Sequence, residues 1–329
     1  MLLDIVLLVL GVALILWGAD KLTDGSSALA RRLNVSDTVI GLTVVAMGSS
    51  LPEFSVSLFS SLQGSGGMSG GNIVGSNLFN VLVIIGAVAA VKPLSLTKST
   101  VRKDIPFTIV ASTVLFLLAK DVLVDDGPSD ILSRVDGCIM LFFFMLFLSY
   151  TYSLAKHKPA LSEEIHVKEM SIPMIICMLL LGFACLIGGG ELLVKSGTSL
   201  ARALGVSETV IGLTILAGGT SLPEFAASLM AARKGSVGMA VGNVVGSCLF
   251  NIFFVLGVCS LVTPMEVNDI SAVQFWVLIG SGVLMWLFSV NCKIGRLEGF
   301  TMCLVYVLYI VYLIAISTQN SGLTEAGLP

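Results

Sequence analysis

The chain has 329 residues, of which 56% are hydrophobic and only 12% charged, and its mean hydropathy is +0.99. A soluble domain of this length needs far more polar surface, so the composition excludes a soluble globular protein. The net charge of -3 includes no basic stripe, which argues against nucleic-acid binding.

Apolar runs long enough to cross a bilayer as helices recur along the whole chain. The sequence therefore predicts an all-α integral membrane protein with about ten transmembrane helices. In chain order we expect these spans near Leu2–Ala19, Thr38–Leu62, Gly71–Val91, Ile105–Leu118, Val135–Leu154, Ile172–Gly190, Thr209–Ala232, Met239–Val262, Ala272–Val290 and Gly299–Ile316.

The longest clearly hydrophilic connection, residues 155–170, lies at the middle of the chain. We interpret it as a central cytoplasmic loop between two five-helix repeats, residues 1–154 and residues 171–317. Residues 318–329 form a polar tail that we expect to be disordered.

An internal repeat is the strongest feature of the sequence. Ser36–Asn80 aligns with Ser207–Asn251 without a gap at an offset of 171 residues, and 28 of the 45 paired residues are identical. Five predicted spans separate equivalent points of the two copies, and an odd number of crossings reverses the direction of the chain. The halves are therefore expected to be inverted-topology repeats, which many secondary transporters use.

Basic residues in the connections support this count. With the N-terminus outside, 14 of the 18 Lys and Arg residues fall in inner connections, which agrees with the positive-inside rule. We therefore expect a multi-pass protein of the cell (inner or plasma) membrane with both termini outside.

Each copy sets a proline and a glutamate inside an apolar run. Ala46–Phe54 reads AMGSSLPEF, and Ala217–Phe225 reads AGGTSLPEF. A carboxylate at the centre of a span costs about 2.5–3.5 kcal/mol on insertion scales, and Glu53 and Glu224 both carry that penalty. A bound cation is the simplest compensation.

The prolines also lack a backbone N–H and break the preceding helical turn. Carbonyls around Ala46–Ser49 and Ala217–Thr220 are therefore expected to lose their partners. Freed carbonyls beside a carboxylate and hydroxyls make a hard oxygen site, the kind that suits Ca²⁺ and Na⁺. The hydroxyls come from Ser49, Ser50, Thr220 and Ser221.

The next span of each copy adds small polar residues. Ser76 and Asn80 are four residues apart and share one helix face, as do Ser247 and Asn251. Flanking glycines allow close helix approach, so a second helix would complete an oxygen cage.

These features also have plainer interpretations, because a proline is often only a kink and a glycine-rich run only a packing seam. Their duplication at equal offsets favours ion binding by Glu53 and Glu224. We interpret the weaker acidic candidates as solvated. They are Asp20 and Glu191 at span ends and an outer cluster of Asp121, Asp125, Asp126 and Asp130, which as an alternative could attract cations before entry. The seven cysteines fall almost entirely in apolar runs, which is typical of small buried side chains.

At these motifs the chain resembles the sodium/calcium exchanger family, within the wider calcium/cation antiporter group. The resemblance covers essentially the whole chain, and the segments that carry it are Gly48–Glu53, Gly75–Asn80, Gly219–Glu224 and Gly246–Asn251. It implies a central Ca²⁺ site shared by Glu53 and Glu224, with Na⁺ sites around it. It further implies that these sites are lined by Ser49, Ser50, Ser76, Asn80, Thr220, Ser221, Ser247, Asn251 and the main-chain oxygens of Ala46 and Ala217.

Three residues depart from the family pattern. Ser49 stands where the family usually has threonine, and Cys248 replaces the asparagine that Asn77 occupies in the first copy. Asn251 stands where some members carry aspartate, which leaves two central carboxylates rather than three.

The expected function is secondary active transport, in which Ca²⁺ exchanges for Na⁺ by alternating access. A Ca²⁺(cation)/H⁺ antiporter on the same scaffold is the alternative, and a passive channel is a third possibility. No span contains a nucleophile–base or metal-hydrolase motif, so we expect no enzymatic activity. The expected partners are the transported Ca²⁺ and Na⁺ and the lipid bilayer. No cofactor is expected, and the oligomeric state is left open.

Overall fold

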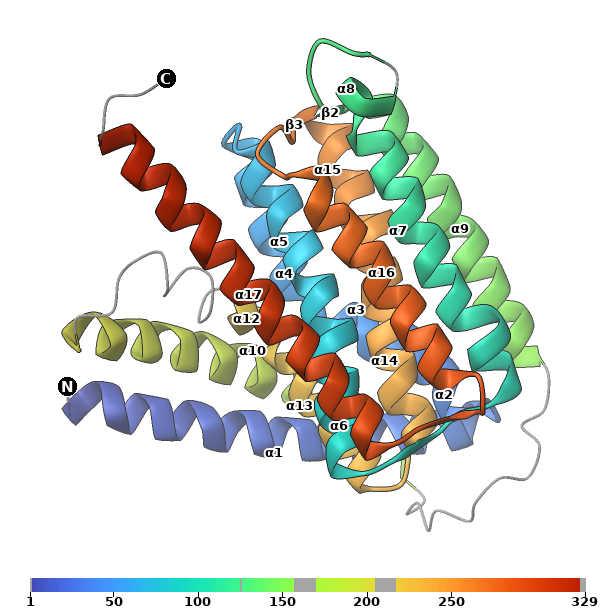
Figure 1. Cartoon of the computed structure of the whole chain (residues 1–329). Helices are drawn as coiled ribbons and strands as arrows, with labels where there is room; N and C mark the ends of the chain where they lie inside the picture. The colour runs from blue at the N-terminus through green and yellow to red at the C-terminus, as the bar shows by residue number, and fades with distance from the viewer. Residues whose placement is uncertain (1, 125, 157–169, 205–216, 326–329) are drawn as a thin grey trace.

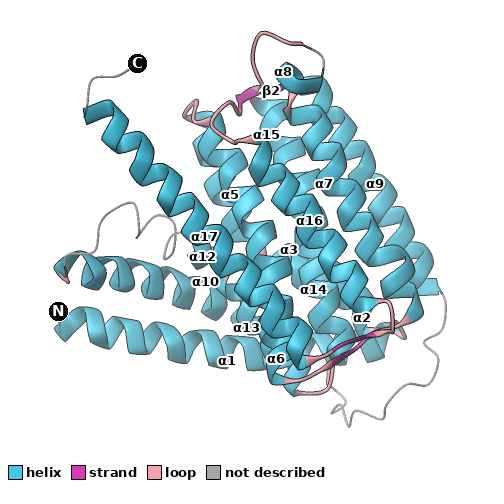
Figure 2. Ribbon diagram, in the orientation of Figure 1, coloured by secondary structure: helices cyan, strands magenta, loops and turns pink. Residues whose placement is uncertain are grey.

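The computed structural model describes residues 2–124, 126–156, 170–204 and 217–325, which are almost entirely helical (Figure 2). In the first half the helices are α1 (Leu2–Leu33), α2 (Asp37–Ile40), η1 (Gly41–Val45), α3 (Ala46–Ser49), α4 (Leu51–Leu62), α5 (Gly66–Leu78), η2 (Phe79–Ile84), α6 (Ile85–Val91), η3 (Thr100–Asp104), α7 (Ile105–Ala119), α8 (Asp121–Val124) and α9 (Arg134–Lys156). The η segments are π-helical turns, continuous with the α-helices around them.

In the second half they are α10 (Ile172–Ala203), α12 (Ala217–Gly219), α13 (Leu222–Arg233), α14 (Val237–Leu249), η5 (Phe250–Leu256), α15 (Gly257–Val262), α16 (Ala272–Ser289) and α17 (Arg296–Glu325). The described residues also contain four short strands: β1 (Leu94–Ser95), β2 (Ile131–Leu132), β3 (Met265–Glu266) and β4 (Lys293–Ile294).

Seven helices of the described residues are long and apolar enough to cross a membrane. The number becomes eight if α2, η1, α3 and α4 form one bent span. The all-α membrane class predicted from the composition is therefore confirmed, whereas the count of ten stays a prediction. The start of the predicted span Thr209–Ala232 lies outside the described residues.

Three helices end well beyond the predicted ends of their spans. α1 and α10 run to Leu33 and Ala203, past the expected ends at Ala19 and Gly190. α17 runs to Glu325, so the disordered tail expected from residue 318 is wrong for residues 318–325. Polar residues at a span end do not stop a helix, because the helix can continue beyond the hydrocarbon with its polar side chains in water.

α1 and α10 lie side by side and run across the direction of α7 and α9 (Figure 1). Glycines bring their backbones together: a Cβ on Gly11 would lie 2.8 Å from the carbonyl oxygen of Gly189, and a Cβ on Gly189 would lie 2.8 Å from that of Gly11. Gly18 and Gly182 make the next close crossing. This small-residue seam is how transmembrane helices pack closely.

The core consists of two continuous helical columns, α5–η2–α6 and α14–η5–α15. Their most apolar windows are 72% and 83% buried, against 33% or less for the other unbent candidate spans. α14 packs on the broken segment α2–η1–α3, where Cβ atoms on Gly242 and Gly246 would meet the carbonyl oxygens of Thr38 and Leu42 at 2.7 and 2.5 Å. The broken helices therefore pack against the two buried columns, α4 on α5 and α13 on α14.

The strands join the two halves. β1 pairs antiparallel with β4, and β2 pairs antiparallel with β3, so each pair takes one strand from each half. Residues 94–95 of β1 and 265–266 of β3 are equivalent in the repeat, at the offset of 171 residues. The helices that precede them, α6 and α15, lie at opposite ends of the molecule (Figure 1).

Candidate cation site

The helix breaks fall next to both Leu-Pro-Glu motifs. Ser50 leaves the helical conformation, with φ −84° and ψ 10°, and Ser221 does the same at −88° and 5°. The segment Asp37–Ser49 meets α4 at a bend of 46°. Because proline is favoured in the first turn of a helix, Pro52 and Pro223 start the new helices α4 and α13. Each glutamate therefore lies in a first helical turn, where a negative charge is favoured.

Glu53 and Glu224 are both fully buried, and each accepts a hydrogen bond from the other half. Ser50 Oγ donates to Glu224 Oε1 at 2.7 Å, and Ser221 Oγ donates to Glu53 Oε1 at 3.1 Å. Ser50 and Ser221 are equivalent in the repeat, as are the two glutamates. These two reciprocal hydrogen bonds bring the two broken helices into contact at the glutamates.

Several polar atoms around this place have no hydrogen-bond partner among the described residues. They include the second carboxylate oxygen of each glutamate, and they are Glu53 Oε2, Glu224 Oε2, Thr220 Oγ1, Asn251 Oδ1, Asn80 Oδ1 and Asn80 Nδ2. A buried polar atom left unpaired costs about 1–3 kcal/mol, and more when it is charged. Five of the six are oxygens, so a cation would compensate that cost for most of the group.

Of the predicted site residues on α5 and η2, Ser76 contacts a glutamate whereas Asn80 does not. Ser76 Oγ lies 3.3 Å from Glu53 Oε1 and 2.9 Å from Ser221 Oγ. Asn80, fully buried, has no partner among the described residues. It is the second residue of η2, and its repeat equivalent Asn251 is the second residue of η5. π-Helical turns often occur at functional sites.

The second copy of this helix differs in its contacts. Asn251 Nδ2 donates to Ser76 Oγ at 3.3 Å and to Asn77 Oδ1 at 3.2 Å. In the repeat, Cys248 takes the place of Asn77 and offers no amide oxygen. Ser247 Oγ contacts the main-chain oxygen of Ala46 at 3.5 Å rather than a glutamate. The departure at Cys248 therefore makes the two sides of the site unequal.

The remaining predicted residues lie on the helix segments before the breaks. Ser49 Oγ contacts Asn243 Oδ1 at 3.2 Å. The prediction that the carbonyl oxygen of Ala46 loses its partner is wrong, because this oxygen still accepts the backbone N–H of Ser50 at 3.1 Å. The helix breaks at Ser50 itself, so the hydrogen bond from Ser50 back to Ala46 is kept. Ala217 begins α12, and its side-chain surroundings lie outside the described residues.

Sequence reasoning missed two asparagines that support the glutamates. Asn72 Nδ2 donates to the main-chain oxygen of Glu53 at 3.3 Å, and Asn243 Nδ2 donates to that of Glu224 at 3.2 Å. Each also donates to a serine of the same broken helix, Ser57 or Ser228. Their identity in both copies, at the offset of 171 residues, is the signal that would have found them.

Three of the acidic groups interpreted as solvated are instead paired: Asp121 and Asp130 in the acidic loop, and Asp20 on α1. Asp130 is buried and forms an ion pair with Lys120, and its other oxygen accepts the backbone N–H of Val122 at 3.0 Å. These contacts hold the acidic loop in place, so Asp130 is a buried structural residue and not a solvated one. Asp121 also accepts a backbone N–H, from Ile131 at 3.1 Å.

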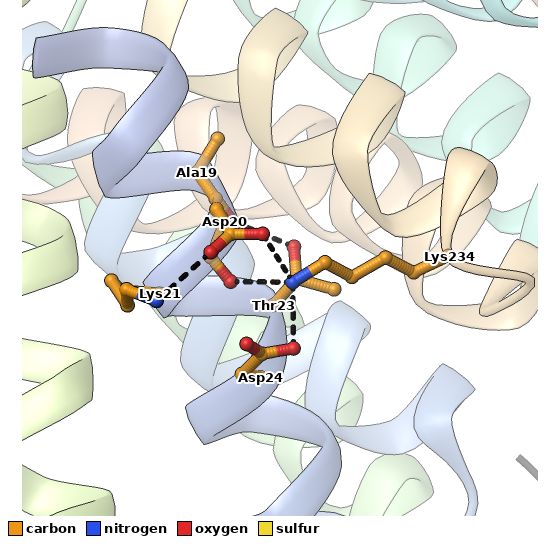
Figure 3. A network of polar contacts seen from close by, with 6 residues as sticks. All are labelled: Ala19, Asp20, Lys21, Thr23, Asp24 and Lys234. Atoms are coloured by element: carbon orange, nitrogen blue, oxygen red, sulfur yellow. Dashed lines mark hydrogen bonds and ion pairs between the residues drawn. The ribbon is translucent and has the colours of Figure 1, made fainter. Parts of the chain in front are cut away.

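A second ionic cluster ties α1 to the end of α13 (Figure 3). The Lys234 ammonium lies 2.6 Å from carboxylate oxygens of both Asp20 and Asp24, and 3.0 Å from the carbonyl oxygen of Asp20. Lys21 pairs with the other carboxylate oxygen of Asp20 at 3.1 Å. The equivalent of Lys234 in the first half is Gln63, so the repeat does not duplicate this cluster.

Comparison with known proteins identifies the family. The family model for sodium/calcium exchanger protein matches residues 3–153 and 174–315. The chain belongs to the sodium/calcium exchanger family. It is a cation antiporter by that membership, a membrane protein whose family transports Ca²⁺ and Na⁺.

Individual members of the exchanger family match nearly end to end. A putative antiporter CaxA of Alkalimonas amylolytica is 35% identical over 320 residues, which cover 94% of this chain and 98% of that protein. The sodium/calcium exchanger MaX1 of Methanosarcina acetivorans is 28% identical over 346 residues, covering 94% and 98%. A solved structure of the sodium-calcium exchanger NCX_Mj superimposes with a TM-score of 0.81 at 32% identity, covering 94% of this chain and 98% of that chain.

Proposed function

We propose that this exchanger moves Ca²⁺ in one direction and Na⁺ in the other through a single site between Glu53 and Glu224. The observation that carries the proposal is the reciprocal contact of the two halves at two buried carboxylates. Ser50 donates to Glu224, and Ser221 donates to Glu53. Both glutamates keep one oxygen without a partner among the described residues.

Charge balance explains why exchange is coupled. Two carboxylates carry a charge of about −2, which one Ca²⁺ or two Na⁺ neutralise. Either load removes the penalty of buried charge, whereas the empty site keeps it. The protein therefore changes orientation when loaded and rarely when empty, so the outward passage of one kind of ion requires the return of a load of the other. Each net charge moved is worth about 2.3 kcal/mol per 100 mV of membrane potential.

We further propose ten spans in two inverted five-helix repeats, with both termini outside. The strand pairs support this arrangement, because equivalent strands β1 and β3 each pair with the other half. The paired columns α5–η2–α6 and α14–η5–α15 also have equivalent residues at their centres. Inverted repeats give alternating access by rocking one half against the other around a fixed site.

Ion flux into vesicles tests the proposal. Purified protein in Na⁺-loaded vesicles should take up Ca²⁺ from the outside, and uptake should stop when internal Na⁺ is replaced by K⁺. Glu53→Gln and Glu224→Gln should each abolish uptake, while Glu191→Gln, which removes an exposed carboxylate, should leave it intact. Normal uptake in both glutamine variants would refute the site.

Coupling to protons is the competing mechanism, and the same vesicles separate it. A pH gradient imposed without Na⁺ should drive little Ca²⁺ uptake if Na⁺ is the coupling ion. Strong uptake under that condition would establish the Ca²⁺(cation)/H⁺ alternative and leave the assignment of Glu53 and Glu224 in place.

A further inference from the structure

An apolar groove lies on the outside of the bundle, away from the cation site. Its volume is about 460 Å³, and α7 and α9 form its walls. Phe107 and Val110 line it from α7, and Phe143 and Leu146 from α9. Val110 and Leu146 are each 45% exposed. In a membrane protein such an exposed apolar groove faces lipid chains.

One end of the groove is polar. Lys103 and Tyr150 line that end, and the hydroxyl of Tyr150 donates to Asp104 Oδ1 at 2.5 Å. Asp104 is buried, whereas Lys103 and its neighbour Arg102 are exposed. The charge presented at the mouth of the groove is therefore positive.

The polar end lies at the basic end of the molecule. α7 begins there and α9 finishes there, at Lys156, on the side where α6 also ends (Figure 1). Connections at this end hold most of the basic residues of the chain, and such an excess marks the cytoplasmic face. From Phe143 to Tyr150 the groove follows α9 for about 10 Å, which is a third of the hydrocarbon thickness.

From this combination we infer that the groove binds one anionic phospholipid of the inner leaflet. An acyl chain lies between α7 and α9 along Phe107, Val110, Phe143 and Leu146. The phosphate lies at the mouth, where Lys103 extends its ammonium to the headgroup level. Basic pockets between helices on the cytoplasmic side are suited to anionic headgroups. A zwitterionic lipid has the same chains but gains much less from the Lys103 ammonium.

Native mass spectrometry of the delipidated protein tests this inference. The probes are phosphatidylglycerol and phosphatidylcholine with identical acyl chains, each titrated into the detergent-solubilised protein. The wild type should bind the first lipid several-fold more tightly than the second. Lys103→Gln should weaken the binding of phosphatidylglycerol about fivefold, because a basic residue near the headgroups contributes about that factor.

Matched variants separate the groove from general surface charge. Arg233→Gln removes one exposed charge at the end of α13, does not touch the groove and should leave binding unchanged. Val110→Trp should fill the groove and reduce binding of both lipids, and Leu146→Trp repeats the test from the opposite wall. Equal binding of the two lipids by the wild type, or unchanged binding in Lys103→Gln and both tryptophan variants, would overturn the inference.

Discussion

Replacing Glu224 by glutamine should weaken Ca²⁺ binding strongly while preserving the fold. The two side chains have the same shape, and Ser50 Oγ, 2.7 Å from Oε1, can donate to an amide oxygen as it does to the carboxylate. What is lost is one of two buried charges. Removing one partner of a buried ion pair costs about 3–5 kcal/mol, and about 1.4 kcal/mol corresponds to a factor of ten in Kd. The Kd for Ca²⁺ should therefore rise by roughly 100-fold to a few thousand-fold.

Thermal unfolding in detergent measures this loss without relying on transport. At a Ca²⁺ concentration of about 100 times its Kd, the wild type should gain about 2.7 kcal/mol of stability from binding. A variant whose Kd is 100-fold weaker should gain no more than about 0.4 kcal/mol at the same concentration. Glu53→Gln should behave alike, and Glu191→Gln should keep the wild-type shift. A wild-type Ca²⁺ shift in Glu224→Gln would show that Ca²⁺ binds elsewhere.

Three further changes test the surrounding structure. Lys120→Met leaves Asp130 buried without its cation, so the free energy of unfolding should fall by about 3–5 kcal/mol. An unchanged midpoint in a denaturant titration would show that the Lys120–Asp130 ion pair does not stabilise the fold. Gly246→Ala places a Cβ 2.5 Å from a carbonyl oxygen of η1 and should lower the melting temperature, whereas Gly280→Ala, with no described atom within 4 Å of its Cβ, should not. Lys234→Gln removes partly exposed ion pairs worth less than about 1 kcal/mol. Its small effect on the melting temperature should vanish in high salt. A large effect that persists in high salt would show that Lys234 does more than form exposed ion pairs.

The membrane class and the central glutamates could be predicted because they depend on strong local signals. A carboxylate beside a proline in an apolar run has few structural explanations, and the repeat supplies the same residues twice. Glu53 and Glu224 are fully buried as this reasoning requires. The assignment of ions to them is a prediction still.

Other features could not be read from the pattern. The π-helical turns η2 and η5 carry Asn80 and Asn251, yet no periodicity distinguishes a π-turn from an α-helix over six or seven residues. The Lys120–Asp130 pair joins residues that composition alone assigns to a solvated loop. Its burial depends on β2 pairing with β3 from the other half, a contact that the sequence does not encode locally.

The reciprocal donation between Ser50 and Glu224, and between Ser221 and Glu53, bears on how such a chain arose. Because each half supplies one donor and one acceptor, two identical half-length chains inserted in opposite directions would satisfy both contacts as an antiparallel dimer. The fused chain is then free to let its halves diverge. Cys248, the repeat equivalent of Asn77, marks one place where the halves have diverged beside the candidate cation site.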